Sequence, residues 1–545
     1  MDATSQPRPM KRSRKRVRRW VGVVALSACV AAVAAARYVI AHAAPILRAR
    51  VIQTLSIRFN SKVELTGFQV SVLRGIEVSG TGLQIFGASD PNPYQSGVQP
   101  LIEIGEFRFQ TALRSLFRSP MHVDTVYVKG MVLNIPPKQN RKEMTAMNSR
   151  AGRLAIIVDK FVCEDTKLVI NTLNAEKPPL EIAISTLQMK EIGRGMPLQF
   201  RATLVNPKPV GEIQSTGLFG PFEQDTPRDT PVQGDYSFSH ADLSTINGIS
   251  GILSSTGEYS GTLSNIAVHG TTDTPDFRIA TSGHTVPLHT EFHAVVDGTW
   301  GDTHLKPVRA SFLHSLLIAN GSVVRMSKGK GHDIELDVTV EKGRIEDLLR
   351  LGVRTEPPVM SGAVTMKTRL SLGPGEDSLV DRMKLAGDFR VEQARFSNVK
   401  VQSKIDWLSL TSQGKPKQAR ELIETDVPVE LQGDYKLNSG MLTFSLLHFL
   451  IPGTRVDMTG SYSLDGQLFD FHGTARLNAK ISQMTTGWKS ILLKPVDPFF
   501  SKNGAGTEVP IKVKGTQSEP HFGLDFGRKD EHENSGRASL GANRR

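Results

Sequence analysis

The chain contains 545 residues, more than the roughly 250 to 300 at which a single hydrophobic core stops growing, so it holds either several domains or one elongated repetitive domain. It has 66 Lys and Arg against 54 Asp and Glu residues, a net charge of +12, but residues 1–19 contain eight of the basic residues and only one acidic residue, Asp2. The rest of the chain is nearly balanced, which argues against nucleic-acid binding, and two cysteines, Cys29 and Cys163, are too few for a disulfide framework or a cysteine-rich zinc site.

The N-terminal residues predict a membrane anchor. Residues 1–19 form a basic head, and the following run from Trp20 to Ala36 contains no charged residue. Residues 38–40 extend this stretch to about 20 residues if the side chain of Arg37 reaches toward the membrane interface. That length is enough to span a bilayer as a helix. We therefore expect a transmembrane segment at residues 20–44, with the basic head in the cytoplasm and the remaining chain on the opposite side.

Two other interpretations of this segment stay open. A cleaved secretory signal would use the same basic head and the alanines at 34–36 as its cleavage site. A lipoprotein signal would use Cys29, but the apolar run continues for seven residues beyond it. Residues 45–60 favour a retained anchor, because an amphipathic helix at a membrane surface has apolar residues at helical spacing. The residues that supply this spacing are Leu47, Val51, Ile52, Leu55 and Phe59.

Residues 61–527 alternate apolar and polar side chains in short runs, which predicts one mainly β domain of antiparallel strands. In the first run Val63 and Leu65 share one face, and Phe68 and Val70 resume in shifted phase after a glycine, as a bulge or tight turn requires. Further strands are expected at 107–110, 123–135, 154–163, 167–172, 179–185, 197–205, 285–298, 333–341, 363–372, 455–464 and 509–515.

Few segments show the 3.6-residue period of a helix. Short helices are expected at 110–120, 343–352 and 480–495. Looser connections are expected at 89–97, 136–152, 220–233 and 412–420, and residues 528–545 are polar and expected to be disordered. These helices are too short to cover both faces of so much sheet. Either the sheet folds onto itself, or another component occupies its apolar face.

One short motif recurs along the strands. Gln-Gly-Asp-Tyr occurs at 233–236 and again at 432–435, and 257–259, 387–389 and 460–462 also read Gly, polar residue, aromatic residue. The copies lack the additional glycines and the lysine of a phosphate-binding loop. We interpret the motif as a strand-entry signature, in which glycine permits a close approach and the aromatic ring packs across to a neighbouring strand.

Catalytic signatures are absent from the sequence, with no Walker-type loop, Gly-x-Ser-x-Gly or His-Glu-x-x-His. Six of the fourteen histidines lie between His269 and His314. Two of them, His289 and His293, fall four residues apart on an expected strand, which separates them by roughly 13 Å, too far to share one zinc ion. We expect exposed sheet-face histidines, no catalytic residues, no metal and no cofactor, hence no enzyme.

Four stretches in order resemble the AsmA-like family of TamB-related Gram-negative envelope proteins, the β-groove or bridge-like lipid-transfer type. The membrane segment runs into ILRARVIQTLSIRFNSKVELTGFQVSVLRGIEVSGTGLQI, and IGEFRFQTALRSLFRSPMHVDTVYVKGMVLNI follows. The middle stretch is TLSNIAVHGTTDTPDFRIATSGHTVPLHTEFHAVVDGTWGDTHLKPVRASFLHS, and the last is GWKSILLKPVDPFFSKNGAGTEVPIKVKGTQSEPHFGLDFG. Together they extend from residue 20 to residue 527.

The resemblance implies a long, curved antiparallel sheet whose apolar face forms a groove for acyl chains. It further implies a single-pass protein of the bacterial inner membrane with a periplasmic body, which carries phospholipid toward the outer membrane. The membrane and phospholipid would be its partners, with an outer-membrane or periplasmic protein as a further one and no nucleic acid. Groove-lining candidates are Val63, Leu65, Phe68, Val70, Ile76, Val78, Phe107, Phe109, Phe292 and Val456.

Two alternatives stay open at this point. The same residues would also form the ordinary core of a closed β-sandwich. A non-transporting assembly factor or scaffold of the outer membrane would have such a closed sheet or would bind an outer-membrane protein along it. The other alternative is an enzyme that acts on glycan or lipid.

Overall fold

The structure is a computed structural model that describes most of the chain between residues 62 and 525, together with short helical pieces nearer the N-terminus. The described residues are 25–31, 33–34, 37–38, 45, 48–49, 51–53, 55–56, 62–71, 76–86, 100–111, 121–135, 156–170, 180–193, 196–221, 223, 226–325, 331–421, 427–464, 468–480, 506–516 and 519–525. The expected helix at 480–495 and the expected disordered tail at 528–545 lie almost wholly outside them, as does most of the expected helix at 110–120.

The fold is mainly β, as the alternation predicts, and the described residues form a 24-stranded sheet with few helices. The first strands are β1 (Val63–Ser71), β2 (Ile76–Ile85), β3 (Ile102–Thr111), β4 (Met121–Ile135), β5 (Ile156–Ile170), β6 (Leu180–Ile192), β7 (Leu198–Pro207) and β8 (Val210–Phe219). The next are β9 (Pro231–Asp242), β10 (Ile249–Ser250), β11 (Ile252–Thr262), β12 (Asn265–Ile279), β13 (Thr285–Val296), β14 (Thr303–Phe312), β15 (Ser315–Arg325) and β16 (His332–Arg344). The last are β17 (Met360–Leu372), β18 (Met383–Phe396), β19 (Val429–Asn438), β20 (Met441–Ile451), β21 (Thr454–Ser463), β22 (Leu468–Leu477), β23 (Thr507–Thr516) and β24 (Pro520–Leu524).

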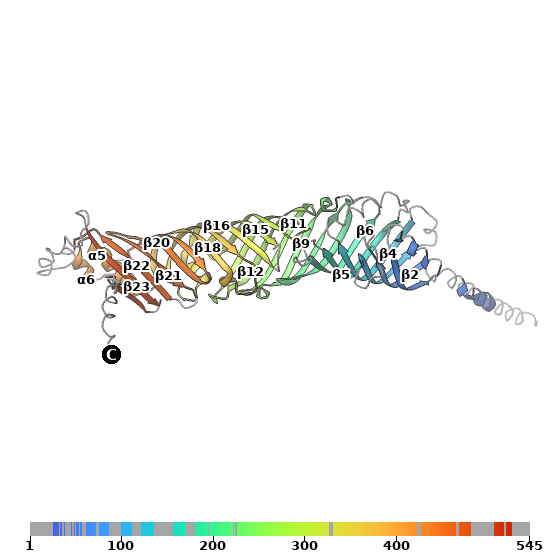
Figure 1. Cartoon of the computed structure of the whole chain (residues 1–545), viewed down its shortest axis with the longest axis horizontal. Helices are drawn as coiled ribbons and strands as arrows, with labels where there is room; N and C mark the ends of the chain where they lie inside the picture. Colours follow the sequence, from blue (N-terminus) through green and yellow to red (C-terminus); the bar gives the residue numbers. More distant parts are fainter. Residues whose placement is uncertain are drawn as a thin grey trace, which may run out of the picture. The chain divides into compact units, whose positions relative to one another are not determined.

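The chain divides into two compact units by its internal contacts. The first unit is Met1–Val205 with Gln214–Gln233, and the second is Asn206–Ile213 with Gly234–Arg545. Within each unit, strands that follow one another in sequence lie side by side, as β4, β5 and β6 do in the first unit and β20, β21 and β22 in the second (Figure 1).

One pair in the first unit departs from the antiparallel pattern. Strands β4 and β5 pair in parallel, with Met121 opposite Ile156 and Ile135 opposite Ile170, so the expectation of antiparallel pairing throughout is wrong here. Parallel neighbours need a connection of about a dozen residues or more, and residues 136–155 supply that length. The expected strands at 154–163 and 167–172 are both part of the single strand β5.

The expected phase shift in the first strands is confirmed, and it is shared by neighbouring strands. Val63 and Leu65, before the shift, belong to one apolar cluster. Phe68, after the shift, packs against the same cluster. The pairing of β1 with β2 keeps a constant register across this point because β2 shifts phase as well, at Gly82, whose φ is +64°. Gly130 of β4 has φ +66° and serves the same purpose. Glycine adopts this left-handed conformation without strain, so the apolar side chains stay on one face.

The sheet of the second unit curves until its two rims meet. The end of β12, the end of β16 and the end of β18 lie on one rim, which also carries α3 (Ile345–Gly352) and α5 (Val399–Ser412); we call it the α5 rim. The opposite rim carries α4 (Leu379–Arg382) between β17 and β18, and we call it the α4 rim. Asn247, in the turn before β10 on the α5 rim, donates from Nδ2 to the carbonyl of Glu376 on the α4 rim at 3.0 Å.

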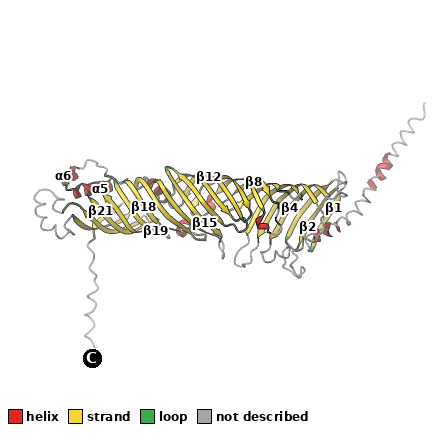
Figure 2. Cartoon of the chain, turned by 90° about the horizontal axis from the view of Figure 1, so that it is seen from above, coloured by secondary structure: helices red, strands yellow, loops and turns green. Residues whose placement is uncertain are grey.

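Helices lie at the strand ends of the second unit. The expected helix at 343–352 is confirmed as α3, whereas α6 (Pro416–Glu421) occupies part of the segment expected to be a loose connection at 412–420, so that expectation is wrong. Figure 2 shows α5 and α6 close to β21. The short 3-10 helix η4 (Leu243–Thr245) also lies in the second unit, whereas the short 3-10 helix η3 (Pro227–Asp229) belongs to the first.

Candidate functional site

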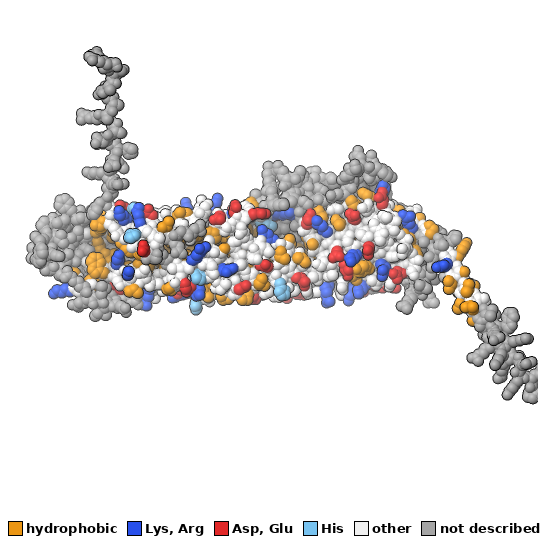
Figure 3. Space-filling view, turned by 90° about the horizontal axis from the view of Figure 1, so that it is seen from below, with side chains coloured by type: hydrophobic (Ala, Val, Ile, Leu, Met, Phe, Trp, Pro, Cys, Tyr) orange, Lys and Arg blue, Asp and Glu red, His pale blue; other side chains and the backbone are white. Residues whose placement is uncertain are grey.

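The sheet of the second unit has an apolar inner face and a polar outer face. In β13, Leu288 and Phe292 are half-buried on the inner face, and His293 is exposed on the outer face. The same alternation continues in β17 and β18, where Met366 lies opposite Phe389 on the inner face, while Lys367 lies opposite Asp388 on the outer face. Figure 3 shows charged side chains of both signs scattered among polar and apolar ones over the strands in view.

Most of the predicted groove-lining residues gather in the first unit. Its apolar cluster, which we call the first-unit cluster, consists of Val63, Leu65, Val78, Leu83, Ile85, Phe107, Val128 and Cys163. Of the other candidates, Phe68, Val70 and Phe109 are partly buried and pack against it. The side chain of Ile76 lies outside the described residues. Seven of the ten candidates therefore belong to the first-unit cluster or pack against it. The buried ones among them form its core and leave little surface for a ligand.

Phe292 and Val456, the two remaining candidates, lie in the second unit and are not brought together. Phe292 is half-buried in β13. Val456 is buried in the second-unit cluster, which consists of Val340, Val364, Val391, Ala394, Val429, Leu431, Leu447, Ile451, Val456, Met458 and Ala475. Of these two, Val456 is core and Phe292 keeps an accessible inner-face surface.

Residues of the expected amphipathic helix also contact the first unit. Ile52 and Leu55 are half-buried and pack against the first-unit cluster, and Arg48 donates to the carbonyl of Leu65 at 2.6 Å. The apolar side of this helical segment therefore faces the sheet at these two residues.

The recurring Gly-x-aromatic motif builds the inner face, because its glycine and its ring are two residues apart and point the same way. Gly433 lies opposite both Phe389 and Leu447, and a β-carbon there would stand 2.4 Å from the carbonyl oxygen of Leu446. The Tyr236 ring fills the space above Gly257 and Gly270 in the same manner. The interpretation of the motif as close approach plus cross-strand packing is confirmed. Its interpretation as a strand-entry signature is wrong, because the glycines lie inside β9, β11, β18, β19 and β21 and not at their first residues.

Aromatic rings consequently form a run across the inner face of β18 to β22. The ring of Phe389 lies 6.0 Å from that of Tyr435 and 6.1 Å from that of Phe444, and Phe444 lies 5.8 Å from Phe471. The Tyr435 hydroxyl donates to the sulfur of Met366 at 3.1 Å, and burial raises the pKa of this hydroxyl. The groove-lining candidates did not include this run, although the motif marks two of its rings, Phe389 and Tyr435, in the sequence.

Helix α5 covers one end of this inner face. Its side chains Ile405 and Leu408 pack on the second-unit cluster, and the Ser409 hydroxyl donates to the carbonyl of Pro452 at 2.8 Å. The Asn398 side chain caps its first turn by accepting from the amides of Lys400 and Val401, as N-cap residues do. We call this part of the inner face the α5-covered end.

Backbone contacts close the mouth of the inner face next to β10. The amide of Leu379 donates to the carbonyl of Asn247 at 3.1 Å, in addition to the Asn247 side-chain bond to Glu376. A β-carbon on Gly248 would stand 2.8 Å from the Leu379 nitrogen, so the two rims touch. We call this contact the mouth bridge. It joins residues 129 positions apart in the sequence, so no local sequence pattern predicts this contact.

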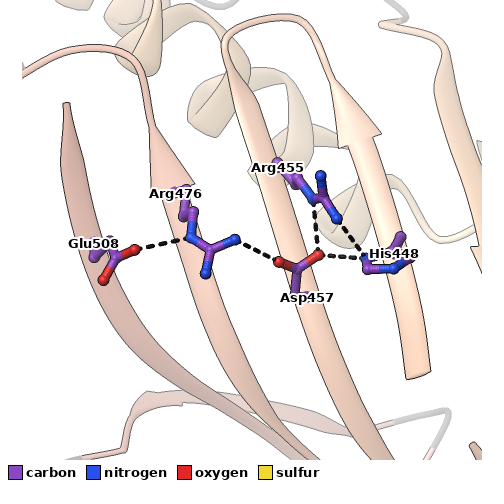
Figure 4. A network of polar contacts seen from close by, with 5 residues as sticks. All are labelled: His448, Arg455, Asp457, Arg476 and Glu508. Carbon is purple, nitrogen blue, oxygen red and sulfur yellow. Dashed lines mark hydrogen bonds and ion pairs between the residues drawn. The ribbon is translucent and has the colours of Figure 1, made fainter. Parts of the chain in front are cut away.

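The outer face carries a charge network behind the α5-covered end. Asp457 accepts from Arg455 at 3.0 Å and from Arg476 at 2.9 Å, and it also contacts His448, while Arg476 reaches Glu508 at 2.8 Å (Figure 4). Burial opposes ionisation of Asp457, but the bonds from Arg455 and His448 outweigh it, so the pKa of Asp457 lies below its ordinary value. Each basic group has an acidic partner, which is the arrangement of a structural network.

A shallow concavity of about 580 Å³ lies on the outer face across β16 to β20. Its charged side chains are of both signs, namely Glu341, Lys367, Asp388, Arg390 and Asp434. Arg390 already donates to Gln432 at 2.9 Å. No single charge dominates this surface.

Three of the histidines, His269, His289 and His293, lie on the outer face of β12 and β13, as expected, whereas His284 and His314 lie in turns between strands. His269 lies opposite His293, with ring centroids 6.2 Å apart, and contacts Glu258. His289 contacts Asp273 at 2.6 Å. Their rings point to solvent, away from the apolar inner face.

Comparisons with protein-family models, with curated proteins and with solved structures each gave no match. In the part of the chain that the structure describes, no helix combines the length and the apolar character needed to cross a membrane.

Proposed function

We propose that the chain is an inner-membrane-anchored periplasmic protein of cell-envelope biogenesis that carries phospholipid toward the outer membrane along its apolar inner face. One observation carries the proposal. In the second unit the inner face of β11 to β14 is apolar, yet residues such as Val268, Leu288 and Phe292 are only half-buried. An apolar surface that remains accessible along successive strands suits a partner made of hydrocarbon.

Acyl chains meet the physical requirement of such a face. Burial of apolar surface is worth about 25 cal/mol per Å², so one acyl chain against the inner face gains several kcal/mol. This transfer needs no nucleophile, metal or cofactor. The charge network around Asp457 lies on the outer face and is not required for it.

The membrane placement rests on the N-terminal sequence. The apolar run after the basic head supports a transmembrane segment at 20–44, with the N-terminus in the cytoplasm and the body in the periplasm. Leu26, Val30 and Val33 lie in helical residues and are 67, 61 and 61% exposed, which suits side chains that face lipid. The resemblance to AsmA-like proteins supports the same placement, and phospholipid, the inner membrane and an outer-membrane or periplasmic protein as partners.

A non-transporting assembly factor is the second candidate, because one part of the inner face needs no ligand. At the α5-covered end, Val391 and Val429 are fully buried by the chain's own side chains. If the rest of the inner face were covered by a protein partner in the same way, the chain would act as a scaffold.

Site-specific photocrosslinking in membranes distinguishes the two functions. A benzophenone amino acid would replace Phe292 on the inner face or His293, its outer-face neighbour, in the full-length chain. We expect phospholipid adducts, identified by mass spectrometry, at position 292 and none at 293. Protein adducts at 292 without lipid adducts would support the scaffold and contradict lipid carriage.

A further inference from the structure

Hydroxyl groups of neighbouring strands line up on the inner face of β9 to β13. Four strands contribute one residue each, and we call this set the hydroxyl belt: Tyr236 of β9, Ser255 of β11, Thr272 of β12 and Thr290 of β13. Ser255 lies opposite Thr272, and Thr272 lies opposite Thr290. The belt therefore crosses neighbouring strands in a continuous row, between apolar residues such as Val268 and Leu288.

The belt retains unused hydrogen-bonding capacity. The hydroxyl of Ser255 donates to the carbonyl of Thr271 at 2.8 Å, so the Tyr236 hydroxyl donates to Ser255, at 3.0 Å. The Thr272 and Thr290 hydroxyls lie 2.6 Å apart. Each hydroxyl has one proton and two lone pairs. One threonine therefore donates its proton to the hydroxyl oxygen of the other, and the proton of the accepting threonine remains available for a ligand. Thr272, Thr290 and Tyr236 are half-buried and therefore reachable.

The segment of β12 next to the hydroxyl belt contacts the turn that carries the mouth bridge. Thr274 lies two residues beyond Thr272 and is 1% exposed. It packs under the turn that leads from the mouth bridge to β11. A β-carbon on Gly251 in this turn would stand 2.8 Å from the methyl carbon of Thr274. The hydroxyl of Thr274 has no hydrogen-bond partner among the described residues. Gly248 of the same turn accepts from the amide of Ala280 at 2.9 Å, which holds this turn on the end of β12.

The closed mouth constrains what a bound lipid does here. Where the rims are apart, a polar head group stays in water while the acyl chains lie on the sheet. At the mouth bridge the rims touch, so the polar part of a lipid that lies on the inner face beside the bridge gains from hydrogen-bond partners on the sheet. A polar group buried without a partner costs free energy, and the hydroxyl belt supplies uncharged donors and acceptors at this place.

We propose that the hydroxyl belt is a binding subsite for the uncharged polar part of a diacyl lipid, its ester carbonyls and glycerol oxygens. This inference rests on the proposed lipid-carrying function. Ester carbonyls accept hydrogen bonds and carry no charge, which matches a belt with a free hydroxyl proton and no ionised side chain. An alkyl chain without esters gains nothing from the belt.

Two fluorescent probes test the subsite on the full-length protein. One is a pyrene-labelled phosphatidylcholine, and the other is a pyrene-labelled alkane without an ester. The variant Thr272→Val with Thr290→Val keeps the side-chain shapes and removes both hydroxyls. We expect its affinity for the phospholipid probe to fall roughly tenfold, as loss of one to two hydrogen bonds implies, with its affinity for the alkane probe unchanged.

Two control variants keep the result interpretable. Thr256→Val with Thr365→Val removes two hydroxyls that are exposed on the outer face and is expected to leave both affinities as in the wild type. Thr272→Ser with Thr290→Ser retains the hydroxyls and is expected to restore phospholipid binding, including in the event that the valine variant does not fold.

Three outcomes would overturn the subsite. Unchanged affinity of the valine variant for both probes would show that the hydroxyls do not bind lipid, while the proposed function would stand. Equal weakening for both probes, with a lower melting temperature, would assign the hydroxyls to folding alone. Failure of the wild type to bind either probe would contradict the proposed function itself, and with it the subsite.

Discussion

The inner face of the second unit differs between the α5-covered end and the stretch around the hydroxyl belt. At the covered end, Val364, Val391 and Val429 are 2, 0 and 1% exposed, and α5 and the aromatic run lie over or beside them. Around the belt, Val268, Leu288 and Phe292 face the same side of the same sheet but are half-buried. The first region is packed as a protein core, and the second is an apolar surface that carries the hydroxyl belt.

This difference shows that alternation along strands does not by itself separate core from binding surface. Both regions alternate apolar and polar residues, and both use glycine opposite an aromatic ring. Among the described residues, the covered end differs in that Ile405 and Leu408 of α5 pack on it. Substitutions at the covered end should therefore act on stability, and those around the belt should act on ligand binding.

The largest expected effect is the contrast between two aspartate substitutions. Val391→Asp places a charge where no solvent reaches and should destabilise the fold by more than about 4 kcal/mol or prevent folding. Leu288→Asp, on the half-buried stretch, should cost only about 1 to 2 kcal/mol. Chemical denaturation of the full-length variants measures both, and similar losses would erase the distinction between the two regions.

The second prediction concerns the close approach at the covered end. Gly433→Ala places a methyl group 2.4 Å from a backbone carbonyl oxygen and should destabilise the fold by about 1 to 3 kcal/mol. Gly373→Ala meets no atom within 4 Å and should be neutral or stabilise by up to about 1 kcal/mol. Melting temperatures of the two variants check this, and an unaffected Gly433 variant would contradict the role given to the motif.

The third prediction is a pH dependence from the outer-face network. The pKa of Asp457 is lowered in the folded state, so its stabilising effect is present above the unfolded value of about 3.9 and is lost as pH falls through the folded pKa. Asp457→Asn should cost about 1 to 2 kcal/mol at pH 7. The difference between wild type and variant should shrink below about pH 4. Chemical denaturation of wild type and variant at several pH values measures this difference in unfolding free energy. A difference that stays constant with pH would show that the charge of Asp457 does not cause it.

The smallest expected effect is at the mouth bridge. Asn247→Ala removes the side-chain bond to Glu376 but keeps the backbone bond from Leu379, so stability should fall by only about 0.5 to 1 kcal/mol. Hydrogen exchange should be faster at the Leu379 amide, because the bridge opens more often. Unchanged exchange there would show that the side-chain bond does not hold the rims together.

The mainly β class was predictable from the sequence because each strand carries its own alternation, but several strands, among them β14 and β20, were not named individually. The sequence also predicted the packing of the Gly-x-aromatic motif, since both residues of the motif lie on one strand. Helix α5 was missed because its apolar residues, among them Val399, Val401, Ile405 and Trp407, do not follow a single helical stripe. The Asn398 cap was the local signal that could have revealed it.

Features that depend on distant residues were not predictable. The parallel pairing of β4 with β5 depends on how the chain returns through residues 136–155, and no local pattern fixes that. The mouth bridge and the hydroxyl belt arise only when the sheet curves and aligns its strands. Among the proposed lining residues, alternation could not distinguish buried Val456 from half-buried Phe292, because both lie on inner-facing positions.

The amount of phospholipid bound per chain tests the central claim most directly. Full-length protein, extracted from membranes and washed, would be analysed by quantitative lipid mass spectrometry together with Phe292→Asp and His293→Asp. We expect near-stoichiometric phospholipid in the wild type and in His293→Asp, and its loss in Phe292→Asp at a similar melting temperature. Lipid-free wild-type protein of unchanged stability would contradict the central claim.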